Sequence, residues 1–104
     1  MKNKIEEMRS AYGLSEEGSL LTMLDDFKDE EIRRYCRMVL RTYSDLKKED
    51  WSIGMEGGDY IYSFAGNHVF ITDDIWSFDL VAKPEVLQLL ADKMRALKKL
   101  SEKT

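Results

Sequence analysis

The hydrophobic positions of the first 48 residues repeat at helical spacing, which predicts a helical N-terminal part. A first helix over residues 2–12 is followed by Gly13, which suits a left-handed helix end, and Leu14 can then fold back onto the last turn. Ser15 or Ser19 can begin a short second helix, because a serine hydroxyl accepts a hydrogen bond from an exposed backbone N–H at a helix start.

A longer third helix is expected to be capped by Asp29 and to continue to about residue 48. One stripe of this helix is apolar and consists of Ile32, Tyr35, Cys36, Val39, Tyr43 and Leu46. The opposite arc is basic and consists of Arg33, Arg34, Arg37 and Arg41, with Lys48. Glu30 and Asp45 lie three or four residues from these arginines, a spacing typical of ion pairs that stabilise a helix.

From residue 51 the hydrophobic period changes to two, which predicts an antiparallel meander of three to four strands. The strands are expected over residues 51–56, 60–65 and 68–72, with a further one over about 76–80. Gly57-Gly58 is expected to form the first turn, and Asp73-Asp74 the last.

The central hairpin of this meander is expected to turn at Gly66-Asn67, a pair suited to a two-residue loop with positive φ. That loop places Phe64 opposite Val69 and Tyr62 opposite Ile71. One face of the hairpin is then strongly apolar, and the other is mixed.

Lys83-Pro84 ends the sheet and begins a last helix over about residues 84–103, since proline fits the first position of a helix. The order of elements predicts an α+β fold with N-terminal helices, the meander and a C-terminal helix. A chain of 104 residues suits a single domain, with a helical part over about 1–48 and the meander over about 51–82.

Charge is segregated along the chain, and this changes the functional reading. The net charge is −4, but residues 49–82 contain no Lys or Arg, seven acidic residues and seven of the eleven aromatic residues. This segment therefore carries −7 and the rest of the chain +3, which together give −4. Such a segment should attract a basic surface.

The first functional hypothesis is a small inhibitor-like or regulatory protein that binds a basic partner protein through this acidic, aromatic sheet. The steering carboxylates would be Asp59, Asp73, Asp74 and Asp79, and the aromatic anchors Trp51, Phe70 and Trp76. A phage or mobile-element antagonist of a nucleic-acid-handling protein fits this size and charge. The opposing interpretation is that helices cover both faces of the sheet and only the turns carry acid.

The alternative function is nucleic-acid binding through Arg33, Arg34, Arg37 and Arg41, which could grip phosphates. The net negative charge lacks the basic signature of such proteins, and the flanking acids favour a solvated helix face.

Catalytic and metal-binding chemistry has little support in the residues. Cys36 and His68 could form a nucleophile–base pair, but Cys36 falls within an apolar stripe, so we expect no enzyme. No metal-ligand spacing is found, and the glycines at 54–58 lead into a strand, so no cofactor is expected.

A single cysteine and no apolar leader indicate a cytoplasmic protein that does not enter a membrane. The last helix or an open sheet edge also suits a homodimer.

Overall fold

The computed structural model describes residues 4–14 and 18–102. Its helices are α1 (Lys4–Ala11), the 3-10 helix η1 (Leu20–Met23), α2 (Asp29–Leu40) and α3 (Pro84–Glu102). Its strands are β1 (Gly18–Ser19), β2 (Lys47–Ile53), β3 (Gly57–Phe64), β4 (Asn67–Asp74) and β5 (Phe78–Ala82). They form one sheet in the order β1-β5-β4-β3-β2, in which all neighbours are antiparallel.

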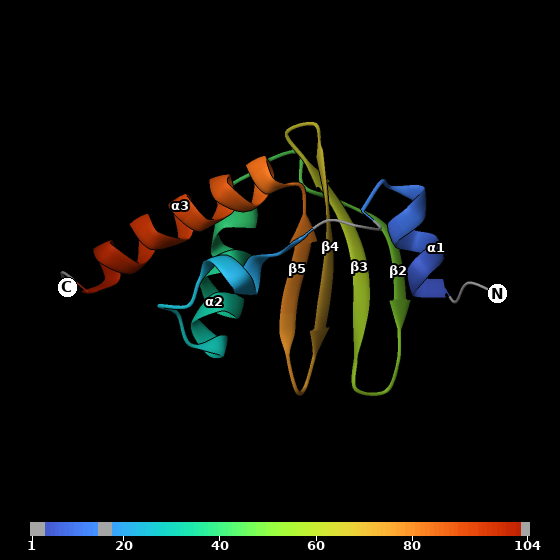
Figure 1. The fold of residues 1–104 in the computed structure, drawn as a ribbon, viewed down its shortest axis with the longest axis horizontal. Helices are drawn as coiled ribbons and strands as arrows, with labels where there is room; N and C mark the ends of the chain where they lie inside the picture. Colours follow the sequence, from blue (N-terminus) through green and yellow to red (C-terminus); the bar gives the residue numbers. More distant parts are fainter. Residues whose placement is uncertain (1–3, 15–17, 103–104) are drawn as a thin grey trace.

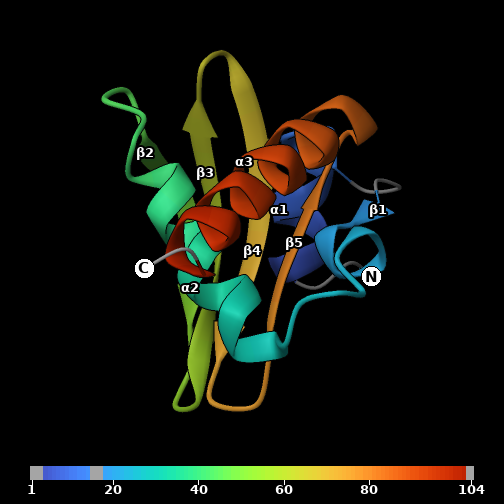
Figure 2. The same cartoon turned by 90° about the vertical axis from the view of Figure 1, so that its left-hand side faces the viewer.

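The helices lie on both faces of this sheet (Figures 1 and 2). One face, here called the α2 face, packs against α2, α3 and η1 and contributes Phe64, Val69 and Ile71 to the larger core. The opposite face, the α1 face, packs Ile61 and Phe70 beneath α1 in a smaller core. The α+β fold predicted from the sequence is confirmed, although a short strand at Gly18–Ser19 brings the number of strands to five.

Several local signals in the sequence are confirmed. Gly13 has φ +72° after α1, and the N–H of Leu14 donates to the carbonyl of Arg9 at 2.7 Å. The hydroxyl of Ser19 accepts the N–H of Leu21 and begins η1, whereas Ser15 lies outside the described residues. The last helix begins at Pro84 as expected.

The predicted end of the third helix is wrong, because α2 ends at Leu40. The hydroxyl of Thr42 donates to the carbonyl of Val39 at 2.6 Å, which closes the last turn. Asp45 then accepts the N–H of Ala65 at 2.8 Å instead of pairing with Arg41. Asp29 is the first residue of the helix and not its cap as expected; the cap is Lys28, whose backbone N–H donates to the Glu31 carboxylate.

The central hairpin turns one residue earlier than predicted. Ala65 and Gly66 both have positive φ, 50° and 78°, so Tyr62 lies opposite Val69 and Tyr60 opposite Ile71. The predicted partners are therefore wrong. The two registers differ by two positions, and every residue keeps the face that the alternation predicts.

The first turn is also displaced, because Gly57 and Gly58 belong to β3 and the turn consists of residues 54–56. The N–H of Gly54 donates to the carbonyl of Gly57 at 2.8 Å and closes the turn. Gly57 has φ +151°, and a Cβ at this position would lie 2.4 Å from the carbonyl oxygen of Asp73. A residue with a side chain cannot fit there without a shift of β4.

Candidate protein-binding surface

Two turns project side by side from one end of the sheet, the 54–56 turn between β2 and β3 and the 75–77 turn between β4 and β5 (Figures 1 and 2). Hydrogen bonds join them directly. The backbone N–H of Ile75 donates to the carbonyl of Glu56 at 2.9 Å, and the indole N–H of Trp76 donates to the Glu56 carboxylate at 3.1 Å. The two turns therefore form one connected surface.

This surface exposes four large apolar side chains, here called the apolar tip: Ile53, Met55, Ile75 and Trp76. Met55 is fully exposed, and the exposed fractions of Ile75 and Trp76 are 67% and 75%. Trp51, half exposed on the α2 face of β2, lies two residues before Ile53 on the same side of its strand. Exposed apolar groups concentrated in one place are typical of interaction surfaces.

The 75–77 turn is held by the side chain of Asp74. Its carboxylate accepts the backbone N–H groups of Trp76 at 2.8 Å and Ser77 at 2.7 Å. These bonds stabilise the ionised carboxyl and lower the pKa of Asp74 below its usual 3.8. The backbone that presents Trp76 is therefore ordered by a negative charge.

This gives a pH prediction for the turn. Because the pKa of Asp74 is lowered in the folded chain, its stabilising effect is complete above the ordinary value of 3.8 and is lost as the pH falls through the lower folded pKa. The amide resonances of Trp76 and Ser77, followed by NMR from pH 7 to pH 2, should move together with a midpoint below 3.8. The same resonances in Asp74→Asn should lack this transition, and a wild-type midpoint at or above 3.8 would contradict the assignment.

Acidic side chains follow the apolar tip on the α1 face. Asp59 lies opposite Thr72, Thr72 lies opposite Asp79, and Asp74 is two residues further along β4, so the three carboxylates share that face. Thr72 donates to Asp59 and Ser19 donates to Asp79. Within the described residues, none of these three aspartates forms an ion pair. This acidic row, Asp59, Asp74 and Asp79, is therefore a source of negative potential.

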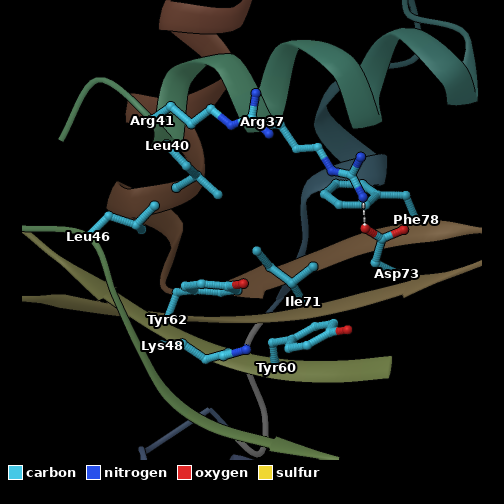
Figure 3. A pocket seen from close by; sticks show the side chains of 10 residues that line it. All are labelled: Arg37, Leu40, Arg41, Leu46, Lys48, Tyr60, Tyr62, Ile71, Asp73 and Phe78. Carbon is cyan, nitrogen blue, oxygen red and sulfur yellow. Dashed lines mark hydrogen bonds and ion pairs between the residues drawn. The ribbon is translucent and has the colours of Figure 1, made fainter. Parts of the chain in front are cut away.

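Asp73 was expected to join that row, but it lies on the opposite face. Arg33 approaches its carboxylate at 3.3 Å, and Arg37 forms a second ion pair with it (Figure 3). Arg33 also donates to the carbonyls of Asp74 at 2.7 Å and Ser77 at 3.2 Å. Asp73 therefore joins α2 to the end of β4, and its charge is compensated within the chain.

Phe70 was expected to be an exposed anchor, but its exposed fraction is 4%. Strand alternation places it on the α1 face, where α1 covers it and the Arg9 guanidinium lies 5.6 Å from the centre of its ring. The two other expected anchors, Trp51 and Trp76, are both exposed.

The four arginines of the alternative hypothesis are not all free to bind a ligand, because most of them already contact other residues of the chain. Arg33 and Arg37 bind Asp73, and Arg34 lies over the ring of Tyr35 at 4.9 Å. Arg41 follows the end of α2 and is exposed, and Lys48 belongs to β2. All four arginines still line one pocket beside α2, as the expected arc requires, whereas Lys48 lies on the sheet and is not part of it.

Cys36 and His68 are not brought together. Cys36 is buried in the larger core, whereas His68 packs on Tyr12 on the α1 side of the sheet, with their ring centres 5.1 Å apart. Burial raises the pKa of the Cys36 thiol to about 12.

The thiol of Cys36 is therefore expected to be inert in the native chain, because almost none of it is thiolate at pH 8 and the core blocks access. Ellman's reagent should give no rapid absorbance change in native buffer and one thiol per chain in guanidinium chloride. Complete reaction within seconds in native buffer would contradict this burial.

Three members of the apolar tip, Ile53, Met55 and Ile75, were not singled out from the sequence. A signal was present for Ile75, a large apolar residue directly after the expected Asp73-Asp74 turn, where polar residues are usual, whereas Met55 was expected within a strand. Their meeting at one end could not be inferred, because it depends on the pairing of β3 with β4.

No protein-family model, curated protein or solved structure matches this chain. Within residues 4–14 and 18–102, no group of three or more metal-ligating side chains is assembled. None of the helices in those ranges is both long and apolar enough to cross a membrane.

Proposed function

We propose that this chain is a small protein-binding regulator that docks its apolar tip into an apolar pocket on a partner protein, with the acidic row facing a basic rim of that pocket. The observation that carries this proposal is the grouping of four exposed large apolar side chains, three on two hydrogen-bonded turns and Ile53 at the end of β2 beside them. Bound in this way, the chain would act by covering the partner's surface.

The ordered state of the tip favours binding. Asp74 fixes the backbone of the 75–77 turn, Arg33 holds the same turn from α2, and Glu56 holds the Trp76 indole. A surface that is already ordered loses less conformational entropy on association. A partly exposed tryptophan in such a position is the residue type that most often dominates interface energies.

The charge around the tip supports a basic partner. Glu56 and the acidic row supply four carboxylates, while Asp50 is paired with Lys4 at 3.7 Å and Asp73 with two arginines. Carboxylates that form no ion pair, beside an apolar patch, raise the rate of encounter with a positively charged surface.

Proteins that handle nucleic acid expose such basic surfaces. A cytoplasmic antagonist of one of them, of the kind that phages and mobile elements encode, is therefore the setting that we propose.

The proposal is tested by affinity capture from the host cell with three forms of the full chain. These are the wild type, the tip variant Ile75→Ser/Trp76→Ser, and the control Leu100→Ser. Leu100 is also exposed (63%) but lies near the C-terminal end of α3, away from the tip (Figure 1). Proteins that the wild type and the control retain and the tip variant loses are identified by mass spectrometry, purified and titrated with each form.

We expect a partner with a basic surface whose binding weakens as salt increases and is lost with the tip variant. Partners that bind the tip variant as tightly as the wild type would overturn the proposal. Tight binding of bare duplex DNA by the purified wild type, with a steep salt dependence, would favour the nucleic-acid alternative instead.

A further inference from the structure

A cleft of about 460 Å³ lies on the α2 face, away from the acidic row. It opens between the C-terminal half of α2 and the part of the sheet formed by β2, β3 and β4 (Figure 3). Tyr60 and Tyr62 line the cleft from β3 and are only partly buried. Its volume falls within the range of small-molecule sites in proteins.

The charge of the cleft is positive. Arg37 and Arg41 line it from the side of α2, and Lys48 lines it from β2. Asp73 is its one carboxylate in the described chain, and Arg33 and Arg37 already bind it. Arg41 makes no side-chain hydrogen bond or ion pair with any residue that the structure describes, so its guanidinium can bind a ligand.

The floor of the cleft is aromatic. The rings of Tyr60 and Tyr62 lie 6.0 Å apart, and the ammonium of Lys48 lies 5.7 Å from the ring centre of Tyr60. Burial raises the pKa of Tyr62, so its phenol stays neutral and can donate a hydrogen bond at physiological pH. The side chains of Leu40 and Ile71 form an apolar part of the wall of the cleft. Flat rings beside unpaired cations are complementary to a flat, negatively charged molecule.

We propose that this cleft binds a small molecule that joins a flat aromatic ring to an anionic group. The ring packs on Tyr60 and Tyr62, and the anionic group lies among Arg41, Lys48 and Arg37. A mononucleotide and an aromatic carboxylate share this chemistry, so the anion can be a phosphate or a carboxylate. The site is distinct from the apolar tip, and its test does not depend on the proposed protein partner.

The test uses isothermal titration calorimetry of the full chain, because an indole or adenine probe absorbs ultraviolet light and would mask tryptophan fluorescence. Three probes are titrated separately: adenosine monophosphate, indole-3-carboxylate, and ribose 5-phosphate, which has the anion without the ring. A titration with inorganic phosphate at the same ionic strength serves as the blank.

We expect saturable binding of at least one of the two ring-bearing probes, and binding of ribose 5-phosphate that is weaker by about tenfold or more. Arg41→Gln should weaken the binding of the ring-bearing probe by about tenfold, because the substitution removes a charged hydrogen-bond donor. Arg34→Gln is the matched control, since Arg34 is on the same helix but does not line this cleft, and it should leave the affinity unchanged. Thermal unfolding of each variant checks that it is folded.

If only adenosine monophosphate saturates the cleft, the anionic group of its ligand is a phosphate. If only indole-3-carboxylate does so, that group is a carboxylate. Either result supports the site. The proposal is overturned if neither ring-bearing probe saturates at millimolar concentration, or if Arg34→Gln weakens binding as much as Arg41→Gln. It is also overturned if a single-stranded oligonucleotide binds with an affinity that depends equally on both arginines.

Discussion

Trp76→Ala is expected to weaken binding of the purified partner by about 2 kcal/mol or more, roughly thirtyfold. Trp76 presents three quarters of its surface to solvent within the apolar tip, and Glu56 and Asp74 hold it in place. Truncation removes a large aromatic area whose conformation is already fixed. Isothermal titration calorimetry of the reconstituted complex measures the change.

The matched control for this variant is Leu100→Ala, which removes another exposed apolar side chain from a different part of the chain. Both variants should keep the melting temperature of the wild type within a few degrees, because surface substitutions change stability little. An unchanged affinity for Trp76→Ala would remove the tip from the interface. An equal loss with Leu100→Ala would show that the loss is not specific to the tip.

Gly57→Ala is expected to have the largest effect on stability. An added Cβ would lie 2.4 Å from both the carbonyl oxygen of Asp73 and the Cα of Asp74, and the φ of +151° is one that side chains rarely adopt. Strain and overpacking together should lower the free energy of unfolding by about 3 kcal/mol. Chemical denaturation, with the slope of the transition held fixed, measures this change.

Gly54→Ala, in the turn that precedes β3, provides the control. A Cβ at Gly54 would be 3.9 Å from its nearest neighbour, the carbonyl oxygen of Gly57, which is an ordinary contact. Its stability should stay within about 0.5 kcal/mol of the wild type. If Gly57→Ala is as stable as Gly54→Ala, then β3 and β4 do not approach each other as closely as the structure has them.

Much of the fold could be predicted because local rules and tertiary structure agree in this chain. Gly13 ends α1, Pro84 begins α3, and the period of two assigns the residues of β3 and β4 to the correct faces. These signals depend on neighbouring residues alone. The end of α2 did not follow from them, because Tyr43 and Leu46 continue the helical stripe and yet reach the core from the connection to β2.

The hairpin register shows a second limit of local reasoning. Gly66-Asn67 is a good turn pair, but the chain turns at Ala65-Gly66 and places the alanine at φ +50°. The N–H of Ala65 binds the Asp45 carboxylate, a contact 20 residues away in the chain. Such a contact can offset a small local cost and cannot be seen in the two turn residues.

The candidate surface was predicted in part. Trp51, Trp76 and Asp74 were expected in it and lie there or beside it, whereas Asp73 and Phe70 do not. Adjacent aspartates point to opposite faces of a strand, so Asp73 meets the arginines of α2 while Asp74 stays on the α1 face. The excess of acid over residues 49–82 therefore overstates the charge that a partner would meet.

The most direct test of the proposed docking is a footprint of the chain in its complex, by hydrogen–deuterium exchange with mass spectrometry. Free and partner-bound chains are compared in the same buffer, and protection is assigned to peptides. We expect added protection in peptides covering residues 53–56 and 74–77, with residues 33–41 of the α2 region unchanged. Protection confined to residues 33–41, with the two turns exchanging as in the free chain, would contradict docking through the apolar tip.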